Sequence, residues 1–284
     1  MTQTIVNPLV STQWLADHLS APDVTVIDAS WYLPAAGRNA RKEYDEGHIP
    51  GAVFFDMDEI ADLSSPWPHM LPSPEKFSSR MRALGVGDGQ RLVIYDGSGV
   101  FSAPRVWWMF RIMGHRDVAV LDGGLPKWKA EGRDLEDMKP YRSARHFTVR
   151  FHQALVRDRA QMLKNLETKQ EQVIDARSHQ RFTGEEAEPR PGLRSGHIPG
   201  SLNLPFTSLL TKDGTFKPGD EIRALFTRAG LDLGKPVVTS CGSGVTAAVL
   251  TLGLYSLGKH DVALYDGSWA EWGSSADLPI ETQA

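Results

Sequence analysis

The feature that most constrains this chain is an internal repeat of four short segments that recur in the same order. Five of six residues are identical between Gly47–Ala52 and Gly196–Ser201, which share the sequence Gly-His-Ile-Pro-Gly. The other matched pairs are Val26–Ala29 with Val173–Ala176, Asp96–Val100 with Cys241–Val245, and Val118–Gly123 with Val262–Gly267. Each segment returns 144 to 149 residues later, so the chain of 284 residues is a tandem duplication of one folding unit.

Each copy alternates short apolar, β-branched runs with longer stretches of helical pattern. Leu92–Tyr95 precedes Ala103–Met113 in the first copy, and Val237–Ser240 precedes Val245–Leu257 in the second. Strands that alternate with helices in this way form parallel sheets covered by helices. We therefore predict an α/β fold class with two tandem domains, each a parallel sheet flanked by helices on both faces.

The stretch between the two copies, residues 137–151, is polar and basic and contains Pro140, a composition typical of a linker. We expect domain 1 to span residues 1–139, the linker 140–152, and domain 2 153–284. The copies also differ in loop length, the second being longer around Arg181–Arg190 and the first around Ser65–Pro72. Extra loop length on an α/β scaffold is where binding residues usually lie.

The composition excludes several classes of function. Lys and Arg number 31 and Asp and Glu 35, giving a formal net charge of −4, whereas nucleic-acid binding needs a basic face. No apolar run approaches the length of a membrane span, and the N-terminus from Met1 to Pro8 lacks the pattern of a secretory signal. The single cysteine, Cys241, excludes an intrachain disulfide and fits a reducing compartment. We expect a cytoplasmic protein that binds neither nucleic acid nor membrane.

Cys241 is the candidate nucleophile. It follows a predicted buried strand and opens a predicted helix, a setting in which backbone N–H groups and the helix dipole stabilise a thiolate. Gly242 and Gly244 allow a tight loop there. A lone cysteine is more commonly a small buried apolar residue, but the first copy has Asp96 at the equivalent position, so the frame itself does not require cysteine. We predict that domain 1 is non-catalytic and that domain 2 carries the reaction.

Several other conspicuous residues are explained more simply by structure. His48 and His197 occur in both copies, including the copy without cysteine, so we expect them to fix the loop after the first strand. The eight tryptophans are expected to pack helices and turns. The sequence has neither a His/Cys cluster with metal-ligand spacing nor a Gly-x-Gly-x-x-Gly after a strand, so no metal and no organic cofactor is predicted.

Three features of the sequence point to a known family. They are the paired Gly-His-Ile-Pro-Gly segments, the loop at Cys241, and the Asp-Gly-x-x-x-x-Trp segments at residues 122–128 and 266–272. Together they resemble the two-domain rhodanese sulfurtransferases over nearly the whole chain. Thiosulfate sulfurtransferases typically carry basic residues in the loop, whereas Cys-Gly-Ser-Gly-Val-Thr is similar to the 3-mercaptopyruvate sulfurtransferases. Loop cations suit the dianion thiosulfate, while mercaptopyruvate carries its charge several atoms from the sulfur.

The resemblance implies how an acidic donor is held. Arg181 and Arg190 match the positions of arginines that bind the carboxylate and keto groups, a task suited to a planar guanidinium. Substrate contacts are further implied for Gly242, Gly244, Val245 and Thr246. From the residues alone, either arginine could instead be a solvated surface residue or the partner of a nearby acid, namely Glu185, Glu186 or Glu188.

The resemblance also implies a group that moves a proton. Ser243, His69 and Asp58 match a Ser–His–Asp arrangement in which a histidine assists the loop serine. Asp56 lies two residues from Asp58 and is the alternative acidic member. Without the resemblance, His69 would be interpreted as a structural hydrogen-bond donor in its loop.

These inferences predict an enzyme that moves sulfur from 3-mercaptopyruvate, through a persulfide on Cys241, to a thiol, cyanide or thioredoxin-type acceptor with release of pyruvate. Two alternatives stay open, a thiosulfate:cyanide sulfurtransferase and a persulfide carrier that does not process a small donor. A cysteine phosphatase is disfavoured, because the loop lacks the arginine that would hold phosphate.

Overall fold

The computed structural model describes residues 7–283. The expectation about a secretory signal falls largely on Met1–Val6, which lie outside the described residues. Within residues 7–283, no helix combines the length and apolar character needed to cross a membrane. The chain divides into two compact units. Unit 1 comprises the described residues up to Asp62 with Pro72–His152 and Lys212–Phe216, and unit 2 comprises Leu63–Leu71, Gln153–Thr211 and the described residues from Lys217 onward.

Unit 1 is built on five parallel strands in the order β1-β5-β4-β2-β3. The strands are β1 (Leu9–Val10), β2 (Val24–Asp28), β3 (Val53–Phe54), β4 (Arg91–Tyr95) and β5 (Val118–Leu121). The helices are α1 (Thr12–His18), η1 (Pro34–Ala36), α2 (Ala40–Glu46), α3 (Met57–Ile60), α4 (Pro74–Ala83), α5 (Ala103–Ile112) and α6 (Gly124–Ala130). Because the strands are parallel, the chain reaches each neighbour through a crossover connection.

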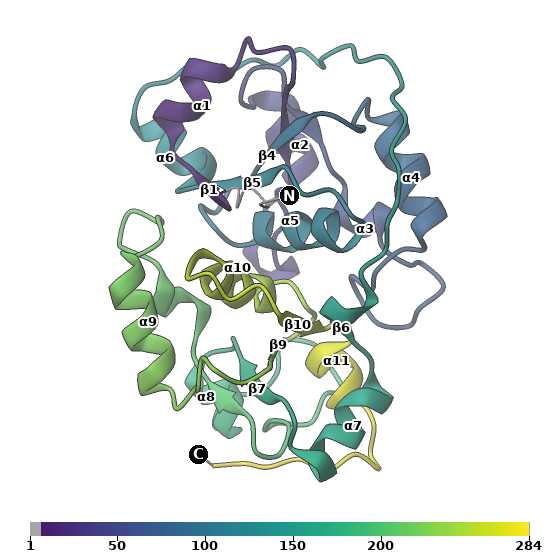
Figure 1. The fold of residues 1–284 in the computed structure, drawn as a ribbon, viewed down its shortest axis with the longest axis vertical. Coiled ribbons are helices and arrows are strands. Elements are labelled where there is room, and N and C mark those ends of the chain that lie inside the picture. The colour runs from purple at the N-terminus through teal and green to yellow at the C-terminus, as the bar shows by residue number, and fades with distance from the viewer. Residues whose placement is uncertain (1–6, 284) are drawn as a thin grey trace. The chain divides into compact units, whose positions relative to one another are not determined.

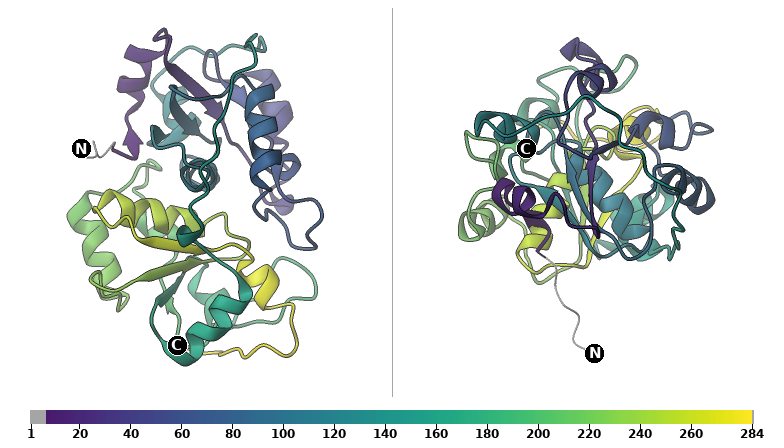
Figure 2. Two further views of the ribbon diagram at one scale, coloured as in Figure 1. Left: turned by 45° about the vertical axis from the view of Figure 1, so that its right-hand side comes forward. Right: turned by 90° about the horizontal axis from the view of Figure 1, so that it is seen from above.

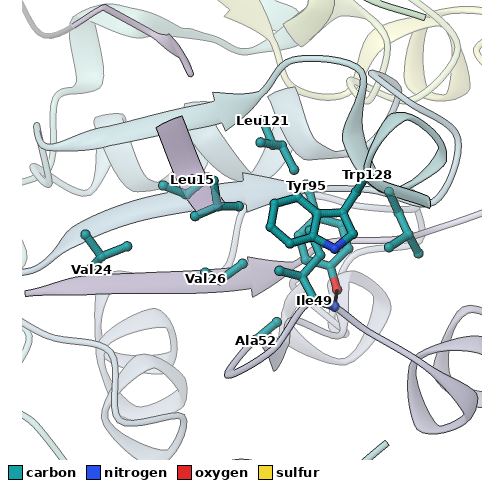
Figure 3. Packing of buried hydrophobic residues seen from close by; sticks show 10 residues of the cluster. Leu15, Val24, Val26, Ile49, Ala52, Tyr95, Leu121 and Trp128 are labelled. Carbon is teal, nitrogen blue, oxygen red and sulfur yellow. Dashed lines mark hydrogen bonds between the residues drawn. The ribbon is translucent and has the colours of Figure 1, made fainter. Parts of the chain in front are cut away.

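The core of unit 1 follows from the alternation of side chains along the strands. Val24 and Val26 of β2 lie two residues apart and point to the same face of the sheet. They pack there with Leu15 of α1 and Trp128 of α6 (Figure 3). The helix α5 packs against β4 and β5 and covers the opposite face (Figure 1).

Unit 2 repeats this plan with five parallel strands in the order β6-β10-β9-β7-β8. The strands are β6 (Val156–Arg157), β7 (Gln172–Asp175), β8 (Leu202–Asn203), β9 (Val237–Ser240) and β10 (Val262–Tyr265). The helices are η2 (Gln153–Leu155), α7 (Arg159–Thr168), α8 (His179–Thr183), η3 (Phe206–Leu209), α9 (Gly219–Arg228), α10 (Ala247–Ser256) and α11 (Ser268–Trp272). Figures 1 and 2 show α10 on one side of these strands and α7 and α11 on the other. The predicted α/β fold with two tandem parallel sheets is confirmed.

The two Gly-His-Ile-Pro-Gly segments make matched contacts in the two units. The main chain of His48 exchanges two hydrogen bonds of 2.9 Å with Glu136, and that of His197 exchanges two of 2.8 and 3.0 Å with Glu281. Nδ1 of each ring lies 2.7 Å from a backbone carbonyl oxygen of the helix before it. The same contacts occur in unit 2, which carries the cysteine, and in unit 1, which does not, and this supports a structural role for both histidines.

Each unit also includes a short segment from the opposite half of the sequence. In unit 2 the carboxylate of Asp266 accepts a hydrogen bond of 2.8 Å from the amide of Leu71. In unit 1 the carboxylate of Asp122 accepts one of 2.8 Å from the amide of Phe216. The aspartate that opens each Asp-Gly-x-x-x-x-Trp segment therefore fastens the added segment in both copies.

Polar side chains of unit 2 gather at one edge of its sheet. Asp175 ends β7, and Cys241 and Asp266 directly follow β9 and β10. These three strands are neighbours in the sheet. The carboxyl ends of adjacent parallel strands meet at the same edge, which is where open α/β sheets bind ligands.

Candidate active site

The loop that carries Cys241 is held by hydrogen bonds to its main chain. The carbonyl oxygens of Cys241 and Gly242 accept bonds of 2.9 and 2.8 Å from the amides of Trp269 and Ala270. The amide of Cys241 donates to Oγ of Ser268 at 3.3 Å. The cysteine is 1% exposed. The start of α11 therefore fixes the peptide groups on both sides of the cysteine.

The other predicted loop residues complete the turn from β9 into α10. Gly244 has a φ of +76°, in the left-handed region that favours glycine. Val245 is buried, and Thr246 is the residue before the first turn of α10. The sequence therefore forms the tight turn between strand and helix that the two glycines predicted.

The equivalent loop of unit 1 carries Asp96, and backbone amides converge on that side chain. Its Oδ2 accepts hydrogen bonds from the amides of Phe101, Ser102 and Ala103 at 2.8, 2.9 and 2.8 Å. Its Oδ1 accepts one from the amide of Ser98 at 2.9 Å. Burial raises the pKa of Asp96, and these four N–H groups act in the opposite direction. The loop frame thus aims several donors at the side chain in the cysteine position.

Both predicted arginines lie against the loop. An added β-carbon on Gly242 would be 3.1 Å from Nη2 of Arg181 and 3.7 Å from Nη1 of Arg190. Nη2 of Arg190 also donates to Oγ of Ser243 at 3.3 Å. Two guanidinium groups therefore border the residue that follows the cysteine.

A buried network of ion pairs holds one of these arginines. Arg181 donates to both carboxylate oxygens of Glu188, at 3.2 and 2.6 Å. The side chain of Glu188 is 1% exposed and also pairs with Arg177 at 2.6 Å. Arg177 in turn pairs with Asp175 at 2.6 Å. The pairing of Arg181 with Glu188, one of the alternatives left open by the sequence, therefore occurs, and the same guanidinium also lies beside the loop.

Sequence reasoning did not identify Arg177, whose side chain is fully buried. Burial by itself lowers the pKa of this guanidinium, but the carboxylates of Asp175 and Glu188 outweigh it and raise the pKa above its ordinary value. A signal was present, because the first copy has Ser30 where the second has Arg177. An arginine that replaces a small residue just after a buried strand, near an acidic insertion, indicates an ion pair.

His69 belongs to the segment Leu63–Leu71 of unit 2, and its Nδ1 lies 3.0 Å from Oγ of Ser243. The histidine is 5% exposed and has a φ of +62°. A left-handed backbone is costly for a residue other than glycine and persists only where surrounding contacts impose it. Here the bond from the amide of Leu71 to Asp266 helps to impose it.

Asp58 belongs to unit 1, where it lies in the first turn of α3. Its Oδ2 accepts a hydrogen bond of 3.0 Å from the indole of Trp31. The alternative acid, Asp56, precedes the same helix and accepts a bond of 3.0 Å from the amide of Glu59. Asp56 is thus engaged as the N-terminal cap of α3, a structural task. Within residues 7–283, no group of three or more His, Cys, Asp or Glu side chains could hold a metal ion.

The fold and the loop define a class of protein, a duplicated α/β unit in which one copy carries a cysteine and the other an aspartate after the same strand. The family model for the rhodanese-like domain matches residues 11–131 and 158–275. The chain therefore belongs to the rhodanese family and carries two copies of its domain.

Characterised relatives are similar over almost all of the chain. The human 3-mercaptopyruvate sulfurtransferase is 48% identical over 270 residues, covering 93% of this chain and 91% of the relative. The thiosulfate/3-mercaptopyruvate sulfurtransferase 1 of Arabidopsis thaliana is 46% identical, covering 97% and 78%. The crystal structure of the Escherichia coli 3-mercaptopyruvate sulfurtransferase SseA superimposes with a TM-score of 0.85 at 43% identity, covering 93% of this chain and 99% of that one.

Proposed function

We propose that unit 2 transfers sulfur from 3-mercaptopyruvate, through a persulfide on Cys241, to a thiol, cyanide or a thioredoxin-type protein. The observation that carries this proposal is the loop of Cys241 bordered by the guanidinium groups of Arg181 and Arg190. The cysteine supplies a nucleophile, and the arginines suit a planar carboxylate. The similarity to sulfurtransferases named for this donor supports the same choice of substrate.

The reaction balances without an oxidant, a reductant or a cofactor. The Cys241 thiolate attacks the sulfur of the donor, an S–S bond forms, and the carbon–sulfur bond breaks with its electron pair on carbon as the enolate of pyruvate. The proton of the donor thiol passes to that carbon, which leaves pyruvate and an ionised persulfide. The acceptor then attacks the outer sulfur, and Cys241 departs as a thiolate.

The amides of the loop are proposed to stabilise the ionised sulfur. The support comes from unit 1, where four amides surround the carboxylate of Asp96 in the equivalent position. By the alignment of the copies, the matching amides in unit 2 are those of Ser243, Thr246, Ala247 and Ala248. The amide of Ala248 donates to the carbonyl of Val245 at 3.2 Å, so we assign the other three to the sulfur. Donors fixed in advance around a developing anion lower the barrier, because no reorganisation is needed during the reaction.

The proton is proposed to move through Ser243 and His69. Oγ of Ser243 accepts a bond from Arg190, so its own hydrogen can point toward Nδ1 of His69 at 3.0 Å. A hydroxyl placed in this way can relay the proton of the donor thiol toward the enolate carbon. We assign Asp58 as the acidic member of the group, since Asp56 caps a helix.

We also propose that residues 1–139 form the non-catalytic domain, 140–152 the linker and 153–284 the catalytic domain. The break between the compact units after His152 supports this division, apart from the two exchanged segments Leu63–Leu71 and Lys212–Phe216. The single cysteine supports a reducing compartment such as the cytoplasm.

Mass spectrometry of the protein after exposure to 3-mercaptopyruvate tests the proposal. We expect one added sulfur on the peptide that contains Cys241, its removal by cyanide, and one pyruvate released for each sulfur bound. Cys241→Ser should abolish all three without unfolding the protein. Sulfur transfer retained by that variant would contradict nucleophilic catalysis at this position. A wild-type protein that neither gains sulfur nor releases pyruvate would indicate a persulfide carrier that does not process this donor.

Thiosulfate is the second candidate donor, because the Arabidopsis relative is named for both donors. The loop from Gly242 to Thr246 contains no cation, which disfavours the dianion. Comparison of kcat/KM for the two donors decides between them. Faster turnover with thiosulfate would overturn the assignment of mercaptopyruvate while leaving sulfur transfer by Cys241 intact.

A further inference from the structure

Ser268, at the start of α11, has an unusual backbone conformation. Its φ is +48°, its side chain is fully buried, and it follows the Asp-Gly pair of the second Asp-Gly-x-x-x-x-Trp segment. A left-handed backbone conformation is unfavourable in free energy for any residue that has a β-carbon, whereas glycine adopts it without this cost. Such strain is retained at positions where the surrounding structure uses the side chain.

The side chain of Ser268 is used at the candidate nucleophile. Its Oγ accepts the hydrogen bond from the amide of Cys241 at 3.3 Å and donates to the carbonyl of Tyr265 at 2.8 Å. The next two residues, Trp269 and Ala270, donate from their amides to the carbonyls of Cys241 and Gly242. Three consecutive residues therefore hold the N–H of the cysteine, its carbonyl and the carbonyl that follows.

The non-catalytic copy lacks two of these three interactions. The residue equivalent to Ser268 is Gly124, with a φ of +53°, and a β-carbon there would clash with the carbonyl oxygens of Asp96 and Gly99. The residue equivalent to Ala270 is Pro126, which has no amide hydrogen. Only the bond from the amide of Leu125 to the carbonyl of Asp96, 3.0 Å long, is common to both copies.

We propose that Ser268 is a positioning residue for Cys241, fixing the peptide group that sets where the sulfur lies relative to the loop amides and the bound donor. This inference rests on the proposed function of Cys241. The difference between the copies is its main support, because room for a β-carbon and a hydroxyl exists at the loop with the cysteine and is closed at the loop with the aspartate. A displaced sulfur reacts more slowly although the donor still binds.

Ser268→Gly and Ser268→Ala separate this role from a purely structural one. Both remove the hydroxyl, but only glycine relieves the left-handed strain, so we expect the glycine variant to unfold at a higher temperature than the alanine variant. Both should lower kcat for pyruvate formation by about tenfold while changing KM less than about twofold. Cys241 is the only thiol, so its alkylation by iodoacetamide can be followed without background. We expect alkylation at neutral pH to be slower in both variants.

Lys169→Gly is the matched control, because Lys169 is exposed, lies in unit 2 and has a φ of +50°. It should unfold at or above the wild-type temperature with wild-type kcat and alkylation. A Ser268→Gly protein with wild-type kcat and alkylation rate would overturn the inference, as would losses of activity that only follow the unfolding temperature. Failure of the wild-type protein to form a persulfide on Cys241 would instead contradict the proposed function.

Discussion

The carboxylate of Asp266 accepts a hydrogen bond of 2.8 Å from the amide of Leu71, a residue 195 positions earlier in the chain. Leu71 lies two residues after His69, whose ring contacts Ser243 of the loop. The segment thus contacts the rest of unit 2 at two points close in sequence, Asp266 just before α11 and Ser243 in the loop of Cys241. This hydrogen bond therefore helps to hold the segment that brings His69 to the loop.

We predict that Asp266→Ala lowers kcat for pyruvate formation by about tenfold, because the segment with His69 loses its anchor. Asp266→Asn retains an oxygen that can accept the bond and should lose less than about threefold. Asp122→Ala removes the equivalent bond to Phe216 in unit 1 and should leave kcat unchanged. Steady-state kinetics of the three proteins check this, and equal losses in the Asp266→Ala and Asp122→Ala proteins would count against it.

Gly242→Ala should weaken donor binding with little effect on folding. The added β-carbon would lie 3.1 Å from Nη2 of Arg181 and 3.7 Å from Nη1 of Arg190, and both are the movable ends of flexible side chains. We expect KM for 3-mercaptopyruvate to rise about fivefold, because displaced guanidinium groups bind the carboxylate less well. An unchanged KM, measured at saturating acceptor, would place the carboxylate elsewhere.

Gly97→Ala makes the matched change in unit 1, where the β-carbon would clash with the hydroxyl of Tyr32. Neither Gly97 nor Gly242 has a positive φ, so backbone strain does not enter the comparison. We expect Gly97→Ala to lower the free energy of unfolding by about 1–3 kcal/mol and to leave KM unchanged. Urea unfolding together with kinetics checks this, and a rise in KM would show that the change acts on more than local packing.

The fold could be predicted because its signals are local or repeated. Recurrence of Gly-His-Ile-Pro-Gly and alternation of apolar runs fix the architecture without knowledge of any contact. The loop after β9 could also be located, since Gly242 and Gly244 mark a tight turn between a strand and a helix. These features depend on neighbours in sequence, where propensity and spacing carry the information.

The remainder of the site depends on contacts between distant residues and on backbone conformation. The pairing of His69 with Ser243 joins residues 174 positions apart and requires a left-handed backbone at His69, which the local sequence does not specify. Arg177 resembles a surface residue in the sequence. Its charge can be buried because the carboxylates of Asp175 and Glu188 pair with it and offset the cost of removing it from water. The role of Ser268 likewise follows only from its hydrogen bond with the amide of Cys241, a contact that the sequence does not indicate.

Glu188→Gln should destabilise unit 2 and weaken donor binding together. Glu188 is buried between Arg177 and Arg181, and loss of its charge leaves two guanidinium groups incompletely paired. We expect the free energy of unfolding to fall by about 3 kcal/mol and KM for the donor to rise as Arg181 loses its orientation. Glu59→Gln breaks the exposed pair with Arg80 and should cost less than about 1 kcal/mol. Equal losses in the two variants would show that burial adds nothing to the pair.

The stability of unit 1 should fall between neutral and mildly acidic pH because of His115. Its Nε2 lies 2.9 Å from the carbonyl of Gln90, its ring stacks on Phe147, and burial lowers its pKa from the ordinary value of 6.5. Near pH 6.5 the histidine therefore takes up a proton in the unfolded chain but not in the folded chain. The contribution of neutral His115 to the free energy of unfolding is complete above that pH and is lost as pH falls toward the pKa in the folded protein. His115→Gln cannot take up the proton. Between about pH 7.5 and 5.5 its free energy of unfolding, measured with urea, should therefore fall less than that of the wild type, by up to about 1 kcal/mol.

Asp96, whose pKa is raised, changes the free energy of unfolding in the opposite direction, but it does so in both proteins and cancels in the comparison. An equal fall in the two proteins would assign the acid sensitivity to another group.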